Sequence, residues 1–310
     1  ILAQVQPGLG AAPPRPACWS HGLLRLPVVA AALLGGGAER HATHKLAALA
    51  SWGRRKAGLD LNEHFVYACD FVNSDGEEVE EEVFDRKAFG AFVQDVLPKL
   101  TGLWELSLKG NELFAREEGS KAVTSFIEAM QAGSLSGCRS LNVSGNSLGS
   151  AAPERARAFL EGLPSSLQHL DASENRLHLF GTSKASGLWN CLCKGRPGLV
   201  TLSLARNNLC RLLPARAPAE AAEGDADGGW EVFGAALELL PCLTHLDLSE
   251  NELDGAPATS LAKVVLPRLP RLEVLDLTGN GPSDGSAGAL GEEALALVRA
   301  AAPSSCEVLF

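Results

Sequence analysis

The chain repeats a short alternation of leucine and polar residues that ends in asparagine. The stretch LTHLDLSENEL, from Leu243 to Leu253, has leucine at positions one, four, six and eleven and asparagine at position nine. Related stretches begin at Leu103, Cys138, Leu167, Leu199 and Leu272. Successive asparagines are 35, 29, 32, 44 and 29 residues apart. Self-similarity at a period of about 20 to 50 residues indicates a solenoid of stacked units.

Each copy predicts a short strand with one buried face. Successive strand side chains point to opposite faces of a sheet, so we expect Leu246 and Leu248 to point inward while His245 and Asp247 point outward. The spacers between copies predict helices, because apolar residues recur at i, i+3, i+4 and i+7. Two such sets are Val123, Phe126, Ile127 and Met130, and Val232, Ala235, Ala236 and Leu239. Repeated strand–helix units of this kind coil into a curved parallel sheet with helices outside.

The pattern L-x-x-L-x-L-x-x-N-x-L resembles that of the leucine-rich-repeat proteins. The long period and helical second halves are most similar to the ribonuclease-inhibitor-like class. The resemblance implies an α/β leucine-rich-repeat solenoid with a curved parallel β-sheet on the concave face and helices on the convex face. It also implies a structural ladder of asparagines that bond the backbone of adjacent turns. The matching residues are Asn111, Asn146, Asn175, Asn207, Asn251 and Asn280.

Both ends of the array carry weaker copies of the motif. In VYACDFVNS, Val66, Cys69 and Phe71 fall at positions one, four and six. The final CEVLF repeats the start of LEVLDL, with Cys306 at position one and Leu309 at position four. Terminal repeats are often atypical and act as caps. The sequence therefore predicts a leucine-rich-repeat domain over 61–310, with a degenerate first repeat over about 66–102, six clear repeats over 103–305 and a partial last strand over 306–310.

Residues 1–60 form an N-terminal extension with a different charge. They contain seven basic and two acidic residues, a net charge of +5, whereas the other 250 residues contain 20 basic and 35 acidic residues, a net charge of −15. The apolar run from Leu26 to Ala38 has 13 residues, which is too short to span a membrane as a helix. Its length suits a signal peptide, and its acid-poor basic flank suits a transit peptide. We expect a disordered or targeting segment on a cytoplasmic protein, with a plastid or secretory route as the alternative if residues 1–56 are cleaved.

The sequence carries no motif for catalysis or cofactor binding. It has no Walker-type phosphate loop, no G-x-S-x-G and no H-E-x-x-H. Its eight cysteines show no ligand spacing, so we expect neither a disulfide framework nor a metal site. The tripeptide His-Leu-Asp occurs at 169–171 and 245–247, which places both pairs on one sheet face. The repeat that begins at Leu199 separates them, and Asp276 recurs without a histidine, so this pair does not predict a metal centre.

The outward positions of the predicted strands are polar, short and mildly acidic. The candidate partner-binding residues on this concave surface are Glu105, His169, Asp171, Ser203, His245, Asp247 and Asp276. The alternative is that these side chains are merely solvated. The acidic balance of the repeats disfavours nucleic acid as a partner and favours a protein with a basic patch.

Two functions fit these observations. The first is a non-enzymatic protein-binding scaffold or adaptor, because curved solenoids present extended concave surfaces. The second is a GTPase-activating regulator of a small GTPase, because Ran GTPase-activating proteins share this repeat class, although the chain lacks their long acidic C-terminal tail. A third possibility is a subunit held in a larger assembly by its convex helices. The fold alone does not decide between them.

Overall fold

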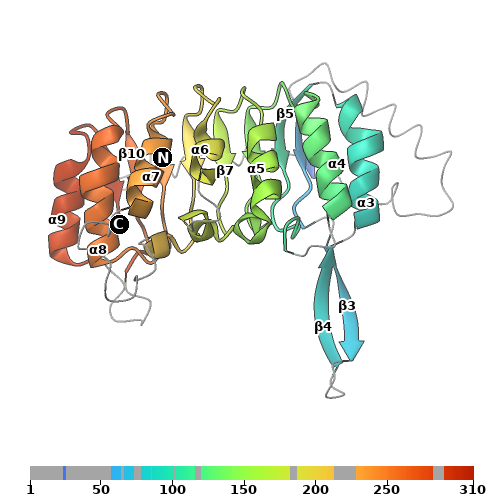
Figure 1. Ribbon diagram of the computed structural model, residues 1–310, viewed down its shortest axis with the longest axis horizontal. Helices are drawn as coiled ribbons and strands as arrows, with labels where there is room; N and C mark the ends of the chain where they lie inside the picture. Colours follow the sequence, from blue (N-terminus) through green and yellow to red (C-terminus); the bar gives the residue numbers. More distant parts are fainter. Residues whose placement is uncertain are drawn as a thin grey trace, which may run out of the picture.

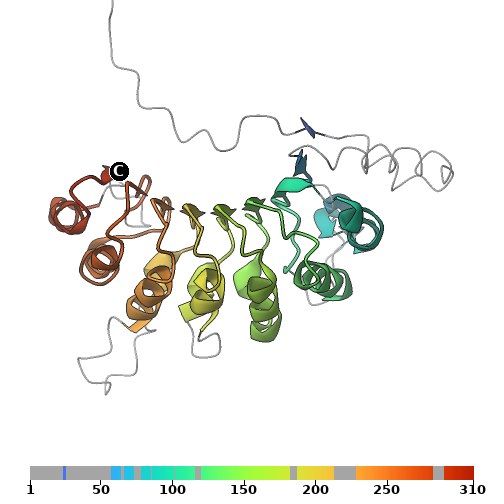
Figure 2. The same cartoon turned by 90° about the horizontal axis from the view of Figure 1, so that it is seen from above.

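The chain forms a curved solenoid in a computed structural model, with strands along the concave side and helices along the convex side (Figures 1 and 2). The structure describes residues 24–25, 57–63, 66–72, 78–84, 86–100, 102–115, 120–181, 187–212, 228–281 and 290–310.

Within these residues, one parallel sheet runs the length of the solenoid and has nine strands. They are β1 (Leu24–Arg25), β2 (Ala57–Asp60), β5 (Leu103–Ser107), β6 (Ser140–Asn142), β7 (His169–Asp171), β8 (Thr201–Ser203), β9 (His245–Asp247), β10 (Val274–Asp276) and β11 (Glu307–Leu309). Neighbouring repeats pair in register, so the position-four leucines of β5 to β10 stack directly on one another. These six leucines are 0–1% exposed. The predicted leucine-rich-repeat solenoid is confirmed.

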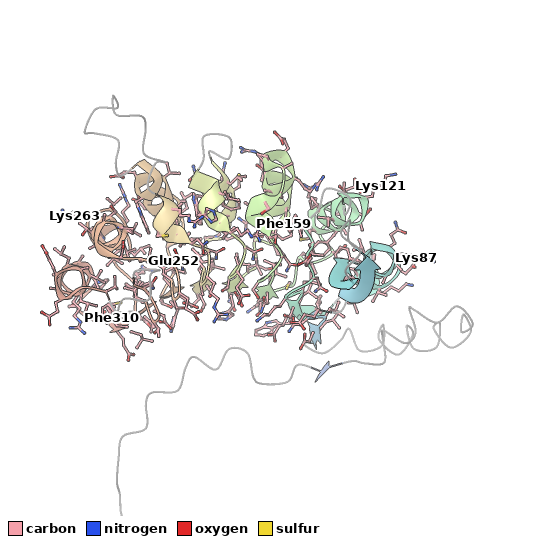
Figure 3. The ribbon with its side chains drawn as sticks, turned by 90° about the horizontal axis from the view of Figure 1, so that it is seen from below. Lys87, Lys121, Phe159, Glu252, Lys263 and Phe310 are labelled. Carbon is pink, nitrogen blue, oxygen red and sulfur yellow. The ribbon has the colours of Figure 1, made fainter. Side chains whose placement is uncertain are left out.

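Helices of one to three turns cover the convex side. The α-helices are α3 (Arg86–Ala91), α4 (Ser120–Gln131), α5 (Pro153–Gly162), α6 (Leu188–Cys193), α7 (Gly228–Leu237), α8 (Gly255–Ser260) and α9 (Glu292–Ala301). The π-helical turns η1 (Phe92–Val96) and η8 (Leu261–Val265) continue α3 and α8, and the 3₁₀ turns are η2 (Leu97–Lys99), η4 (Leu148–Ser150), η5 (Leu177–Gly181), η7 (Leu209–Leu212) and η9 (Leu266–Arg268). Phe159 lies between its helix and the sheet, whereas Lys87 and Lys121 project outward (Figure 3).

The helical periodicity gives the correct buried face for α4 but not for α7. In α4, Val123, Phe126, Ile127 and Met130 are at most 5% exposed. In and after α7, Val232 and Leu239 are 43% and 44% exposed, while Trp230, Phe233 and Leu237 are fully buried. The aromatic side chains bury far more apolar surface than Val and Ala, so they set the helix rotation, and the predicted face of α7 is wrong.

A buried arginine joins two of the convex helices. Arg196 is 2% exposed, and its guanidinium donates to carbonyl oxygens in or just after the last turns of α5 and α6. The Nη1 atom donates to Cys191 O (2.8 Å), Leu192 O (2.9 Å) and Lys194 O (2.7 Å), and Nη2 donates to Leu160 O and Leu163 O. Cations are favoured at helix C-termini, where carbonyls lack helical partners. Arg196 therefore links the helical layer of two successive repeats.

The predicted degenerate first repeat is wrong in its strand. The stretch read as that strand is β3 (Val66–Val72), which pairs antiparallel with β4 (Glu78–Phe84). These two strands form a separate hairpin that projects from the solenoid near α3 (Figure 1). Alternating apolar residues serve an antiparallel hairpin as well as a repeat strand, so the pattern alone did not separate the two.

The first strand of the solenoid next to β5 is β2. Its Leu59 pairs with Leu106 and its Asp60 with Ser107, and Leu59 and Leu61 are 6% and 2% exposed. The sequence signal was present, because GLDLNE around Leu59 matches HLDLSE around Leu246. This copy of the motif is hard to recognise because histidine, His64, occupies position nine in place of asparagine. The boundary predicted at residue 60 therefore falls inside the sheet and moves to about residue 57.

At the C-terminal end β11 extends the sheet, but its register differs from the prediction. Cys306 donates its N–H to Pro303 O across the same turn that precedes Leu272. The following segment is one residue shorter, so Val308, not Leu309, pairs with Leu275. A shift of one residue exchanges the two faces of a strand. Leu309 is therefore aligned with Asp276 on the concave side, and the assignment of Leu309 to position four is wrong.

The expected N-terminal extension lies mostly outside the described residues, which include only Leu24–Arg25 before residue 57. These two residues pair in parallel with β2. The targeting role of residues 1–56 stays a prediction. No helix in the described part of the chain is long and apolar enough to cross a membrane.

Candidate functional site

The six asparagines at position nine form a continuous hydrogen-bonded column in the turns that follow the strands. Asn175 shows the pattern: its Nδ2 donates to Val143 O of the preceding repeat (2.9 Å) and to Ser173 O (2.8 Å). Its Oδ1 accepts the N–H groups of Asn146 (3.2 Å) and Leu148 (3.0 Å). One side chain thus holds backbone groups of two neighbouring repeats.

The same bonds recur along the array. Each of Asn146, Asn175, Asn207, Asn251 and Asn280 accepts the N–H groups of residues nine and eleven of the repeat before it. All six asparagines, including Asn111, are 0–2% exposed. Buried backbone groups need partners, so these residues build the turns and are not available to a ligand.

The candidate binding residues lie on the concave face of the sheet, in two rows. Position three of successive strands from β5 to β10 reads Glu105, Ser140, His169, Thr201, His245 and Val274, and position five reads Ser107, Asn142, Asp171, Ser203, Asp247 and Asp276. The sheet therefore brings His169, Asp171, Ser203, His245 and Asp247 together on β7 to β9. Asp276 lies next to them on β10, and Glu105 lies two strands away on β5. We call β7 to β9 with these five residues the central strip.

The aspartates of this face also shape the turn after each strand. Asp171 Oδ1 accepts the Ser173 N–H (3.0 Å), and Asp247 Oδ1 and Asp276 Oδ1 accept the corresponding N–H groups two residues on (both 2.9 Å). Asn142 makes the same bond to Ser144 (2.9 Å). Aspartate and asparagine commonly stabilise turns in this way. Sequence reasoning missed this role, although the recurring Asp-x-Ser/Thr pattern carries its signal.

A chain of side-chain hydrogen bonds fixes the position-five residues of the central strip. Ser203 Oγ donates to Asp247 Oδ2 (2.7 Å) and lies 2.8 Å from Ser173 Oγ. Ser249 Oγ donates to Asp247 Oδ1 (2.7 Å). These bonds hold the Asp247 carboxylate in one orientation. A preorganised carboxylate loses less conformational freedom when it binds a cation.

The two histidines flank Thr201 in the position-three row. His169 Nδ1 lies 3.1 Å from Thr201 Oγ1, and His245 Nδ1 lies 2.7 Å from Thr244 Oγ1. Burial, and then the charge of His245, lower the pKa of His169. Residues two apart in a strand are separated by about 6.6 Å along the backbone, so each histidine lies beside the aspartate of its own strand.

Burial also perturbs two of the carboxyl groups. It raises the pKa of Asp171, with hydrogen bonds from Ser173 acting in the opposite direction. It raises the pKa of Glu105, and the nearby Asp60 adds to the effect. Glu105 is 7% exposed, and its Oε1 atom has no hydrogen-bond partner among the residues that the structure describes. A buried acceptor without a partner is costly, so Glu105 is an unusual residue on this face.

The charge of the concave rows has one sign at neutral pH. Apart from the two histidines, every ionisable side chain at positions three and five of β5 to β10 is a carboxylate. Arg206, at the turn after β8, is paired with Glu250 (2.7 Å) and Glu174 (3.2 Å). Within the described residues no group of three or more His, Cys, Asp and Glu side chains could hold a metal ion. Such an arrangement of carboxylates attracts cationic groups.

One family model agrees with the repeat motif, and one solved structure has a limited similarity to the chain. The Leucine Rich Repeat family matches residues 242–264. Among solved structures, the chain is similar to the leucine-rich repeat-containing protein LegL7 from Legionella pneumophila, with 19% sequence identity and a TM-score of 0.40. That similarity covers 63% of this chain and 60% of the LegL7 chain. No curated protein sequence matches the chain.

Proposed function

We propose that this leucine-rich-repeat protein is a non-enzymatic scaffold or adaptor that binds a protein partner through its concave face. The observation that carries the proposal is the central strip, where Asp171 and Asp247 stand on alternate strands with Ser203 between them. Their side chains are partly accessible and held by hydrogen bonds. Short side chains between the charges allow a partner to approach the sheet closely.

Charge complementarity defines the partner class. An acidic, preorganised surface attracts a basic patch, raises the association rate and excludes acidic competitors. The array as a whole resembles the ribonuclease-inhibitor-like class in its long period and convex α-helices. We also propose that the protein belongs to this class and that it is located in the cytoplasm.

The use of the ionisable groups supports a non-enzymatic role. Acid–base catalysis needs a basic side chain that is oriented toward a nucleophile or toward a proton of the substrate. Here His169 bonds a threonine hydroxyl, and each aspartate uses an oxygen to close its own turn. These side chains support recognition better than proton transfer.

Capture of partners from the source organism tests the proposal. The full chain is compared with the double variant Asp171→Asn/Asp247→Asn. Asparagine preserves the turn bond, as Asn142 shows in the same row, so the variant removes two charges with little change in the backbone. The matched control is Glu128→Gln/Glu238→Gln, which removes two exposed charges from the convex side.

We expect the concave variant to lose at least about 80% of the captured partner at physiological salt, and the convex control to retain it. Loss of several charge-assisted contacts of about 1–3 kcal/mol each accounts for this size of effect. Equal capture by the wild type and the concave variant would place the binding surface elsewhere on the solenoid.

A further inference from the structure

Both strands of the central strip that carry an aspartate also carry a histidine two residues earlier. His169 precedes Asp171 on β7, and His245 precedes Asp247 on β9. Residues two apart share a face of their strand and lie about 6.6 Å apart along the backbone. The strands pair in register through β8, with Thr201 between the two histidines. A cation bound to Asp171 or Asp247 therefore lies within reach of an imidazole charge.

The other side chains around these histidines are mostly uncharged. Positions three and five of β6 and β8 hold Ser140, Asn142, Thr201 and Ser203. On the outer strands the rows add Glu105 and Ser107 on β5, and Val274 and Asp276 on β10. The position-seven residues that follow β5 to β10 are uncharged except for Lys109, after β5. Carboxylates ordinarily titrate near about pH 4 and lysines above about pH 10, so histidine is the ordinary source of a charge change between about pH 5 and 8.

Hydroxyl contacts allow both imidazoles to gain a proton in place. His169 Nδ1 lies 3.1 Å from Thr201 Oγ1, and His245 Nδ1 lies 2.7 Å from Thr244 Oγ1. A threonine hydroxyl donates to a neutral imidazole nitrogen or accepts from a protonated one, so either contact serves both charge states. Both histidines are partly exposed. Burial, and then the charge of His245, lower the pKa of His169, so His169 is neutral at pH 7 and becomes charged only below the ordinary histidine range.

Protonation of the histidines changes the charge of the strip. With neutral imidazoles, the two aspartates give the strip a charge of −2, and two imidazolium groups add +2, so the net charge becomes zero. The raised pKa of Asp171 also removes negative charge as pH falls. A surface that attracts a basic group above the histidine range therefore loses that attraction below it.

We propose that His169 and His245 make the concave face release a basic partner below about pH 6.5. Each imidazolium group repels the bound cation and competes with it for the neighbouring aspartate. By reciprocity, a bound cation disfavours formation of the imidazolium by the same factor. Affinity is therefore complete above the histidine range and is lost as pH falls through it. The inference rests on the proposed function and deepens it by naming how binding is regulated.

The test measures binding of a fluorescein-labelled octa-arginine peptide to the full chain at about pH 7.5 and about pH 5.5, on either side of the ordinary histidine range. Guanidinium groups stay charged throughout this interval, so any change belongs to the protein. Dissociation constants come from fluorescence anisotropy at constant ionic strength, and circular dichroism confirms that each variant is folded at both pH values. The variant Asp171→Asn/Asp247→Asn measures peptide binding elsewhere on the chain.

Wild type is compared with His169→Gln/His245→Gln, in which glutamine keeps a hydrogen-bonding side chain that does not become charged. The matched control is His178→Gln. His178 lies in η5, outside the concave rows, with its Nδ1 atom 3.1 Å from Asn207 O. Burial lowers the pKa of His178, as it lowers that of His169, so the control removes a similar titrating group from a different place.

We expect wild type and His178→Gln to bind the peptide at least about fivefold less tightly at the lower pH, because two repulsive charges enter the site. The affinity of the double histidine variant should change by less than about twofold, and each single variant should retain part of the decline. An equal wild-type affinity at both pH values would overturn the inference, and so would a decline that persists in the double histidine variant.

The aspartate variant separates this inference from the proposed function. If that variant binds the peptide weakly at the higher pH while wild type shows no pH dependence, the inference fails and the acidic concave face still binds cations. If it binds as tightly as wild type at the higher pH, the acidic surface of the proposed function fails as well.

Discussion

The asparagine column should contribute more to stability than any surface residue, and Asn175→Ala measures this. Truncation removes the acceptor of two buried N–H groups, those of Asn146 and Leu148. The two carbonyls that Asn175 bonds keep other donors, since Val143 O also accepts from Asn146 Nδ2 and Ser173 O from the Gly145 N–H. At about 1–3 kcal/mol for each unsatisfied buried group, the two amides cost about 2–6 kcal/mol.

Urea unfolding followed by circular dichroism gives the change in the free energy of unfolding. A loss of this size is a large part of the about 5–15 kcal/mol that stabilises a typical domain. Because the damage lies between neighbouring repeats, the transition should also broaden. Asn190→Ala on the exposed side of α6 is the control and should change the free energy by less than about 0.5 kcal/mol.

Asn208 refines the comparison. An ordinary surface residue next to the column would tolerate alanine within about 0.5 kcal/mol. The φ of Asn208, 56°, lies in the left-handed region, where a non-glycine, non-asparagine residue costs about 1–2 kcal/mol. Asn208→Ala should therefore lie between Asn190→Ala and Asn175→Ala. If Asn175→Ala proved no more harmful than Asn190→Ala, the energetic role of the column would be refuted.

Further predictions concern three buried or partly buried groups and one activity. Arg196→Met should lower the free energy of unfolding by about 2–4 kcal/mol, because buried helix-end carbonyls lose their donor; urea melts of Arg196→Lys should show partial recovery. Because the pKa of Glu105 is raised in the folded protein, its contribution to stability declines as pH rises above the ordinary glutamate range. Thermal melts should therefore show that Glu105→Gln is more stable than wild type at pH 7. This difference should shrink toward pH 4. The lowered pKa of His169 gives a pH dependence of the opposite sign, so the free energy of unfolding should fall as pH drops below about 6.5. His169→Gln should make the stability less dependent on pH in this range. In single-turnover assays the chain should not accelerate GTP hydrolysis by a panel of small GTPases; acceleration would favour the GTPase-activating alternative.

The sequence predicts the repeated part of the fold well because the same requirement recurs in every unit. Leucine at position four must be buried between sheet and helices, and asparagine at position nine must bond two backbones. The signal is repeated six times, so chance matches are excluded. The concave rows follow directly, since a known register assigns each side chain to a face.

Prediction fails where a residue pattern has more than one structural solution. The alternation in Val66–Val72 serves the β3–β4 hairpin, while Leu59 carries the repeat with histidine in place of asparagine. The Ala-rich α7 allows two rotations, and only packing of Trp230 and Phe233 decides between them. Whether Glu105 Oε1 finds a hydrogen-bond partner among the described residues depends on what surrounds it in three dimensions. No one-dimensional pattern encodes that environment.

The most direct test of the account is the affinity of the captured partner for the central strip as salt is varied. Wild type and Asp171→Asn/Asp247→Asn are titrated with the purified partner between about 50 and 500 mM salt, where screening shortens the range of charge interactions from about 14 to about 4 Å. We predict at least about tenfold weaker binding by the variant at low salt, a shallower salt dependence, and convergence with wild type at high salt. Identical affinities and identical salt dependences would contradict the claim that the acidic concave face binds the partner.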